Sequence, residues 1–148
     1  LYIEDGPRKP VEVGTGSGIL AIALAKRFGI RVVAGDNDPV AIDVAVENAR
    51  INGVSESISF HVSEGLSDVA IQASIPFDLV IANIVANPLI EMTGEISQAI
   101  APEGHVILSG ILSEQAEEVL NRYQQHGFTF DDRVIENEWE TLILSKKG

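Results

Sequence analysis

The stretch Val11-Glu12-Val13-Gly14-Thr15-Gly16-Ser17-Gly18-Ile19-Leu20 decides the fold of this chain. An apolar strand pattern runs here into three alternating glycines and then into an apolar helical pattern. Glycines at such a junction allow tight or positive-φ backbone and the close approach of a ligand, while the helix behind them offers unpaired N–H groups. The stretch therefore predicts a nucleotide-binding turn. A dinucleotide fingerprint would need glycine where Ile19 stands, which disfavours an NAD-dependent oxidoreductase.

Strand and helix patterns alternate along the chain, which predicts an α/β fold with parallel βαβ units. We expect strands at 11–13, 31–35, 58–62, 77–81 and 106–108, and helices at 20–28, 39–52, 89–100 and 113–125. Asp38 is a candidate cap of the second helix and Ser113 of the last one. Residues 128–135 and 139–144 are joined by three residues, too few for a parallel crossover, and predict an antiparallel hairpin at the sheet edge.

Length, charge and cysteine content narrow the class of protein. With 148 residues we expect one domain, residues 1–148. Zero cysteines and the lack of a signal peptide or long apolar run suit a cytoplasmic protein. The net charge of -12 opposes direct nucleic-acid binding, since no basic stripe is present, and we expect no membrane partner. An acidic surface would suit a basic partner such as a lysine-bearing protein.

Polar residues follow several of the predicted strands. Asp36 comes directly after the second strand, 22 positions after Gly14, where a carboxylate can take both hydroxyls of a ribose. Glu64 and Leu66, after the third strand, could contact an adenine, although a plain loop is an equal alternative. Asn83 follows the fourth strand, where its carbonyl could orient an attacking amine or its side chain could brace the loop. Ser109-Gly110, after the fifth strand, could line the pocket or form a simple turn.

Two other kinds of chemistry are disfavoured. The histidines His61, His105 and His126 show no metal-ligand spacing, so we expect no metal and assign them structural roles. The sequence around Ser17 lacks the G-x-S-x-G form of a hydrolase nucleophile elbow. Trp139 is interpreted as hairpin packing rather than a cofactor contact.

The G-x-G-x-G pattern with an acidic residue two positions earlier resembles the first motif of methyltransferases that use S-adenosylmethionine (SAM). Enzymes of this class that methylate bases or amides usually show Asn or Asp, two prolines and an aromatic residue after the fourth strand. This chain has Asn83 without that triplet, so an aliphatic amine is favoured as the methyl acceptor.

One branch matches over nearly the whole chain, the methyltransferases that modify large-subunit ribosomal protein 11. The matching stretches are 14–23 (GTGSGILAIA), 36–41 (DNDPVA), 47–54 (ENARINGV), 82–89 (ANIVANPL), 108–112 (LSGIL), 115–116 (QA) and 138–139 (EW). The resemblance implies SAM-dependent transfer of methyl groups to lysine and N-terminal amines of that ribosomal protein, with S-adenosylhomocysteine as product. It also implies a Rossmann-like class I methyltransferase fold, with a mostly parallel seven-stranded sheet of order 3-2-1-4-5-7-6 and strand seven antiparallel.

The resemblance also assigns roles to single residues. Glu12 and the glycine turn would hold the methionine end of the cofactor, Asp36 the ribose, the loop after the third strand the adenine, and Asn83 would face the transferred methyl as the catalytic residue. The full set implied for cofactor binding is Glu12, Gly14, Thr15, Gly16, Gly18, Asp36, Asn37, Glu64, Gly65, Leu66 and Asn83.

Two departures from the family pattern leave alternatives open. Members usually carry aspartate where Glu12 stands, and they carry an N-terminal substrate-recognition domain and a glycine/threonine-rich segment that are not found in these 148 residues. We therefore expect a C-terminal fragment. The alternatives are a methyltransferase acting on a small molecule or RNA, and a SAM-binding domain that is inactive as a fragment.

Overall fold

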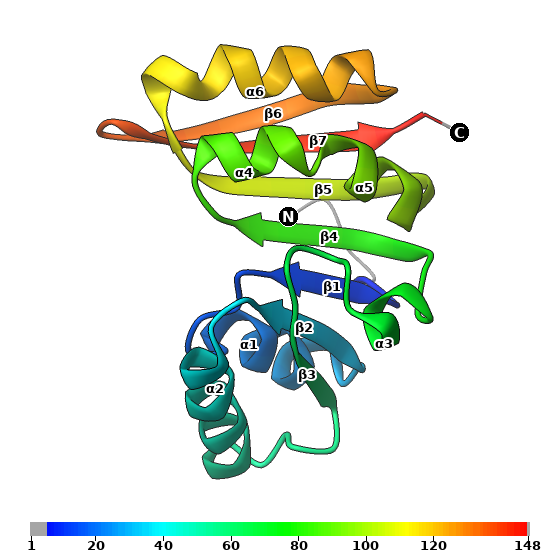
Figure 1. Cartoon of the computed structure of the whole chain (residues 1–148), viewed down its shortest axis with the longest axis vertical. Coiled ribbons are helices and arrows are strands. Elements are labelled where there is room, and N and C mark those ends of the chain that lie inside the picture. The colour runs from blue at the N-terminus through cyan, green and yellow to red at the C-terminus, as the bar shows by residue number, and fades with distance from the viewer. Residues whose placement is uncertain (1–5, 148) are drawn as a thin grey trace. The chain divides into compact units, whose positions relative to one another are not determined.

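The computed structural model describes residues 6–147, and its elements follow the predicted alternation of strands and helices (Figure 1). The strands are β1 Pro10–Val13, β2 Val32–Asp36, β3 Ile58–Val62, β4 Phe77–Asn83, β5 Ile100–Leu112, β6 Phe128–Glu136 and β7 Trp139–Lys146. The helices are α1 Ile19–Phe28, α2 Pro39–Ile51, α3 Val69–Gln72, α4 Ala86–Glu91, α5 Thr93–Ala99 and α6 Ser113–Gln125. The sheet has seven strands in the order β3-β2-β1-β4-β5-β7-β6, with β7 antiparallel to its neighbours, which confirms the predicted fold class.

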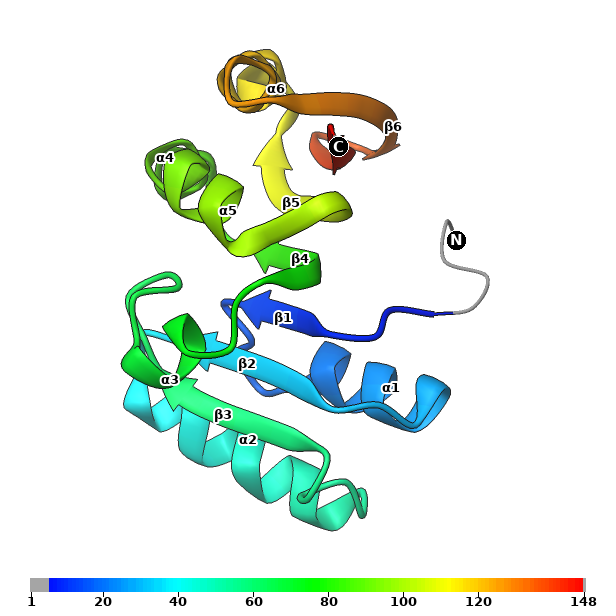
Figure 2. The same cartoon turned by 90° about the vertical axis from the view of Figure 1, so that its right-hand side faces the viewer.

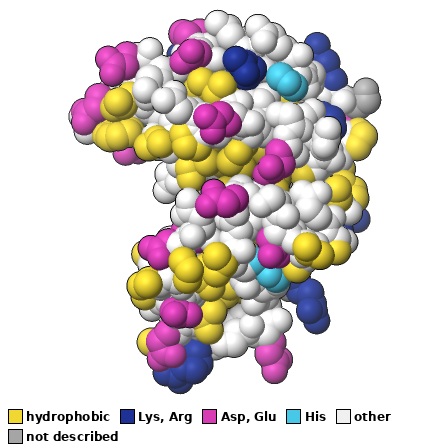
Figure 3. All heavy atoms as spheres, in the orientation of Figure 1, with side chains coloured by type: hydrophobic (Ala, Val, Ile, Leu, Met, Phe, Trp, Pro, Cys, Tyr) yellow, Lys and Arg dark blue, Asp and Glu magenta, His cyan; other side chains and the backbone are white. Residues whose placement is uncertain are grey.

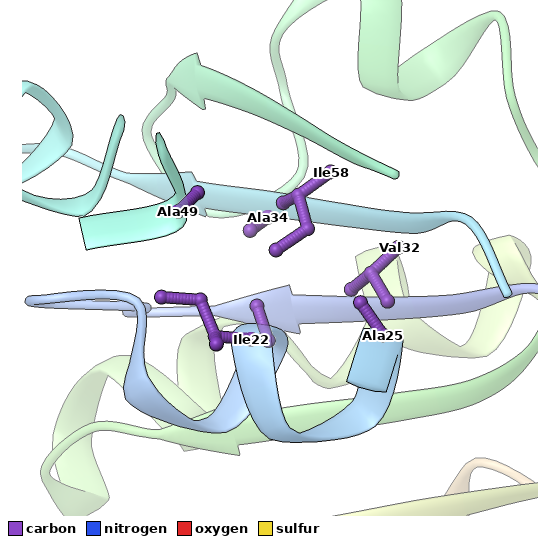
Figure 4. Packing of buried hydrophobic residues seen from close by; sticks show 7 residues of the cluster. Ile22, Ala25, Val32, Ala34, Ala49 and Ile58 are labelled. Atoms are coloured by element: carbon purple, nitrogen blue, oxygen red, sulfur yellow. The ribbon is translucent and has the colours of Figure 1, made fainter. Parts of the chain in front are cut away.

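The chain divides into two compact units, Leu1–Ser74 and Ile75–Gly148. In the first unit β1 pairs with β2, and β2 with β3, in parallel. Alternate residues of a strand point to opposite faces, so Val32 and Ala34 of β2 share one face. There they pack with Ile58 of β3 and with small and apolar residues of α1 and α2, as Figure 4 shows. The buried members of this cluster are Ala21, Ile22, Ala25, Val32, Ala34, Ala49 and Ile58.

The opposite face of the first unit is covered by α3 (Figure 2). Ile71 of this short helix is fully buried, and a Cβ added to Gly35 would lie 3.2 Å from its Cδ1 atom. The lack of a side chain at Gly35 therefore lets α3 pack closely against β2.

In the second unit β4 pairs with β5 in parallel, and β7 lies between β5 and β6 in antiparallel pairing. Helix α6 buries residues at helical spacing, namely Ala116, Val119, Leu120 and Tyr123. The hydroxyl of Tyr123 donates a hydrogen bond to the carbonyl of Leu89 at 2.8 Å, which links α6 to α4. Burial raises the pKa of this hydroxyl, so it stays protonated as the donor.

Several predicted boundaries were wrong for local reasons. The predicted helix at 89–100 is two helices, because the chain breaks at Met92 and the Thr93 hydroxyl bonds back to the Ile90 carbonyl at 2.7 Å. Strand β5 starts earlier than expected, since Ile100 pairs with Phe77 before a register shift. Helix α3 was not predicted.

The two predicted helix caps had different outcomes. Asp38 caps α2, its carboxylate accepting a hydrogen bond from the Val40 N–H at 2.9 Å, as expected. Ser113 does not cap α6: it is the first helical residue, Leu112 holds the cap position, and the Ser113 N–H donates to the Glu138 carbonyl at 2.8 Å.

Gly18 is the position in the glycine turn where packing is tightest, and it gives a stability prediction. Its φ is 83°, and an added Cβ would lie 3.0 Å from the Cβ of Ala45 in α2. We expect Gly18→Ala to lower the free energy of unfolding by about 2 to 4 kcal/mol. Alanine is strained at this positive φ, and its Cβ would lie too close to the Cβ and Cα atoms of Ala45, which cannot move without the helix backbone. Urea denaturation measures this change.

Gly29→Ala is the matched control, because Gly29 has φ 62° but nothing within 4 Å of an added Cβ. Strain alone should cost it about 1 to 2 kcal/mol. Equal losses in the two variants would contradict the close contact between the turn and α2.

Candidate functional site

The glycine turn between β1 and α1 has the backbone that the sequence predicts. Gly14, Gly16 and Gly18 have φ values of 78°, 57° and 83°, a region that side-chain-bearing residues rarely adopt. A Cβ added to Gly16 would meet nothing within 4 Å, so the backbone there faces open space. The turn thus leaves room for a ligand to approach the main chain.

Hydrogen bonds fix this turn on the end of β2. The N–H groups of Gly14 and Thr15 both donate to the carbonyl of Gly35, at 2.9 and 3.0 Å. The Gly18 N–H donates to the Thr15 carbonyl at 2.9 Å. These four residues supply one another's hydrogen-bond partners, so the protein itself sets the shape of the turn before any ligand binds.

Asp36, the last residue of β2, joins the same network through its side chain. One carboxylate oxygen accepts a hydrogen bond from the Gly16 N–H at 2.9 Å, and the other accepts from the Asp38 N–H at 3.0 Å. The carboxylate is therefore held in one orientation, and each oxygen keeps a lone pair that can accept a ligand hydroxyl. Asn37, next in the chain, is exposed.

Glu12 is a buried carboxyl group beneath the turn. Its side chain is 3% exposed, accepts a hydrogen bond from the Thr15 hydroxyl at 2.6 Å, and also accepts from the Ala21 N–H. Burial raises the pKa of Glu12 to about 7, although the two hydrogen bonds act in the opposite direction, and the negative charge of Asp36 adds to the rise. Glu12 is thus poised to lose its proton when a cation binds.

The loop after β3 provides the other candidate residues of the first unit. Glu64 is exposed, and Gly65 takes a φ of 58°. Leu66 is fully buried, so within this loop Glu64 and Gly65 are the residues that a ligand can reach.

Asn48 of α2 is a supporting residue that we did not assign a role from the sequence. Its side-chain amide donates to the carbonyl of Ser17 at 2.9 Å and so anchors the middle of the glycine turn. The available signal was its position between Ala45 and Ala49 on the buried face of an amphipathic helix, where a polar side chain needs a partner.

In the second unit, Asn83 is the last residue of β4 and its side chain is exposed. Its carbonyl oxygen accepts a hydrogen bond from the Ser109 hydroxyl of β5 at 3.2 Å. Gly110 has φ 81°, and a Cβ there would lie 3.0 Å from that same oxygen. Ser109 and Gly110 do not form the simple turn that was one alternative: they lie where the β5–β7 register shifts.

The structure therefore brings Glu12, Thr15, Gly16 and Asp36 together in the first unit, and Asn83, Ser109 and Gly110 together in the second. The first group fits a ligand with a cationic end and vicinal hydroxyls, because the Asp36 carboxylate and the carboxyl group of Glu12 lie beside the partly exposed backbone of Gly16. The His61 side chain contacts Ser59 and lies 3.6 Å from the carboxylate of Asp68.

Within residues 6–147, no group of three or more His, Cys, Asp or Glu side chains could hold a metal ion. None of the helices in that same range is long and apolar enough to cross a membrane.

The raised pKa of Glu12 predicts a pH-dependent stability. The pKa of Glu12 is 4.5 in the unfolded chain and about 7 in the folded chain. Between pH 4.5 and about pH 7, the folded chain therefore retains a proton that the unfolded chain has released. The stabilising contribution of neutral Glu12 is complete below about 4.5 and is lost as the pH rises through about 7. Glu12→Gln keeps a neutral acceptor for Thr15, so its stability relative to the parent should rise by on the order of 3 kcal/mol between pH 4 and pH 8.

Urea denaturation of the two chains at both pH values measures this difference. Thr15→Val is the second variant, because loss of the hydroxyl bond removes a group that favours ionised Glu12. This variant should therefore lose more stability in total, with the loss extending to a higher pH than in the parent. A difference between parent and Glu12→Gln that does not change with pH would contradict the raised pKa.

Comparison with known proteins agrees with this geometry. The family model described as ribosomal protein L11 methyltransferase (PrmA) matches residues 3–147. Relatives called ribosomal protein L11 methyltransferase include those of Brucella abortus (strain S19) and Agrobacterium fabrum, each 43% identical over 139 residues. These alignments cover 94% of this chain and 49% and 48% of the relatives, so the chain spans about half their length.

Solved structures with the same fold include one of a protein with a similar name. The crystal structure of a ribosomal protein L11 methylase from Lactobacillus delbrueckii subsp. bulgaricus has a TM-score of 0.90 and 31% identity, and the match covers 99% of this chain and 73% of that one. An RNA methyltransferase from Salinibacter ruber in complex with S-adenosyl-L-homocysteine shares the fold, with a TM-score of 0.73 and 17% identity, over 95% of this chain and 81% of that one. On the family match and the identity to its relatives, the chain belongs to the ribosomal protein L11 methyltransferase (PrmA) family.

Proposed function

We propose that this chain is the SAM-binding, methyl-transferring part of an enzyme that methylates amine groups of ribosomal protein L11. The observation that carries the proposal is the family match over residues 3–147. Within this range, the Gly16 N–H of the glycine turn donates a hydrogen bond to the Asp36 carboxylate. Since the chain spans about half the length of its curated relatives, both the activity and the substrate are proposals for this chain.

The first unit would hold the cofactor. SAM supplies a sulfonium-bound methyl group that a nucleophile can displace. Glu12 would accept hydrogen bonds from the cationic methionine end, and Asp36 would accept hydrogen bonds from the two ribose hydroxyls. The loop from Glu64 to Leu66 would face the adenine. Gly14, Gly16 and Gly18 would let the cofactor lie against the main chain. Thr15 would act through Glu12, to which its hydroxyl is bonded, and Asn37 would border the ribose.

The second unit would act on the acceptor amine. The Asn83 carbonyl oxygen would accept an N–H of the amine and align its lone pair with the methyl carbon, which is the main task of the protein in such a displacement. An amine reacts only as its neutral form, and lysine has an unperturbed pKa near 10.4, so a desolvated site must favour loss of the proton.

The charge of the chain fits a basic substrate. The net charge is -12, and acidic side chains are spread over the face shown in Figure 3. Such a surface attracts lysine-rich polypeptides and repels phosphate backbones. This observation favours a protein substrate over an RNA substrate on the same fold.

Calorimetric titration tests the cofactor class. We expect saturable binding of S-adenosylhomocysteine and none of NAD. The second step is incubation with labelled SAM and isolated L11, where label in the L11 amines supports the proposal. Binding without transfer to L11 would restrict the chain to a SAM-binding domain, and binding of NAD alone would overturn the cofactor assignment.

Asp36→Ala tests the ribose assignment. The variant loses both acceptor oxygens as well as the bond to Gly16, so its affinity for S-adenosylhomocysteine should fall by at least about 100-fold in calorimetry. Asp43→Ala is the matched control, since Asp43 is exposed on α2 and should leave the affinity unchanged. An Asp36 variant that binds as tightly as the parent would refute the assignment.

Asn83→Ala tests the amine-orienting role. We expect the rate of methyl transfer to L11 to fall by about 100-fold, because the amine loses its alignment. The affinity for S-adenosylhomocysteine should change much less. Asn87→Ala, exposed in α4, is the control in the same asparagine tract. Equal loss of transfer in both variants would point to a disturbed loop and not to the Asn83 amide.

A further inference from the structure

The loop after β3 is organised by one buried serine. Ser63 is 6% exposed, and its backbone N–H donates to the carbonyl of Asp36 at 2.9 Å. Its hydroxyl donates to the carbonyl of Gly65 at 2.9 Å and accepts a hydrogen bond from the Asp68 N–H at 3.1 Å. A single residue therefore connects the carboxyl end of β2, the tip of the loop and the start of α3.

A second contact holds the other end of the loop. The side-chain amide of Gln72, at the end of α3, donates to the carbonyl of Leu66 at 2.7 Å. The Leu66 side chain is fully buried, so this residue is fixed from both its side chain and its main chain. The backbone from Glu64 to Leu66 is thus fixed before any ligand arrives.

We propose that Ser63 is a positioning residue that sets the base selectivity of this loop, by fixing the main-chain N–H groups of Glu64 and Gly65 relative to Asp36. The inference rests on the proposed function, since it takes this loop as the adenine-facing side of the SAM site. Ser63 acts through the loop and does not itself touch the base.

Base selectivity is the property that a fixed main chain should give. Adenine presents an amino donor at position 6 and an acceptor at N1, whereas hypoxanthine presents a carbonyl acceptor and an N–H donor at those positions. A main-chain N–H held in one place can donate to N1 of adenine. The N1–H of hypoxanthine would face the same N–H donor to donor and leave both unpaired, which is costly in a desolvated site. A loop that can relax rotates its peptide groups to suit either base, so it discriminates less.

The experiment compares three ligands on the 148-residue chain by calorimetry: S-adenosylhomocysteine, S-inosylhomocysteine and 5′-methylthioadenosine. The parent should bind S-adenosylhomocysteine more tightly than the inosine analogue. Ser63→Ala leaves the Gly65 carbonyl and the Asp68 N–H without their hydroxyl partner. We expect it to weaken S-adenosylhomocysteine about 10-fold and to bring the ratio of the two affinities close to one.

5′-Methylthioadenosine lacks the amino-acid end, so the same loss of affinity for this ligand would assign the defect to the nucleoside side. Ser67→Ala is the matched control, because Ser67 is an exposed serine of the same loop. It should change neither the affinities nor their ratio. Ser63→Thr keeps a hydroxyl at this position and should keep the parent's ratio.

Gln72→Ala is the second variant, and it provides the test of the inference if Ser63→Ala fails to fold. Gln72 is exposed and holds the loop only from outside, through Leu66. Gln72→Ala should also lower the ratio of the affinity for S-adenosylhomocysteine to that for S-inosylhomocysteine. A folded Ser63→Ala chain with the parent's ratio, or a Gln72→Ala chain with that ratio when Ser63→Ala does not fold, overturns the inference.

A parent chain that binds both homocysteine ligands equally tightly likewise overturns this inference alone, because the cofactor class would stand. A parent chain that binds none of the three ligands overturns the proposed function together with it.

Discussion

The bonds between the glycine turn and the end of β2 are the constraint on which the rest of the first unit depends. One carbonyl, that of Gly35, accepts two N–H groups of the turn, and the carboxylate of the next residue, Asp36, accepts a third from Gly16. Because these bonds set where the turn leaves β1, they also set where α1 begins and where the partly exposed backbone of Gly16 lies. A site built this way needs no rearrangement of its main chain to receive a ligand, which lowers the cost of binding.

The same network carries a stability cost. Glu12 is almost fully buried between two valines of β1, where an apolar side chain would favour folding. The hydrogen bonds from Thr15 and from the Ala21 N–H offset the effect of burial only in part, since the pKa of Glu12 still rises to about 7. The positive charge of the cofactor proposed above would compensate this cost and would account for a buried carboxyl group at this position.

The parts of this molecule that could be predicted from sequence are those set by local patterns. The alternating strands and helices, the positive φ of the turn and the Asp38 cap all follow from spacing and residue type. Helix α3 was missed because its four residues are too short to show a period, and the break at Met92 depends on the Thr93 hydroxyl bonding back to the chain. Ser63 and Asn48 could be seen as polar residues, but their roles depend on partners far along the chain or on a loop conformation.

The two units show one arrangement at the carboxyl ends of β2 and β4. Asp36 is the last residue of β2 and Asn83 the last residue of β4, and in each case a side-chain oxygen accepts a hydrogen bond from another segment. The donors are the Gly16 N–H for Asp36 and the Ser109 hydroxyl for Asn83. A positive-φ glycine accompanies each, Gly16 as the donor itself and Gly110 as the residue whose missing Cβ leaves room for the Asn83 oxygen. Carboxyl ends of parallel strands in open α/β sheets are where ligands bind. A rigid strand with a clamped acceptor at its last residue is therefore a means of holding an oxygen in place without a long, flexible side chain.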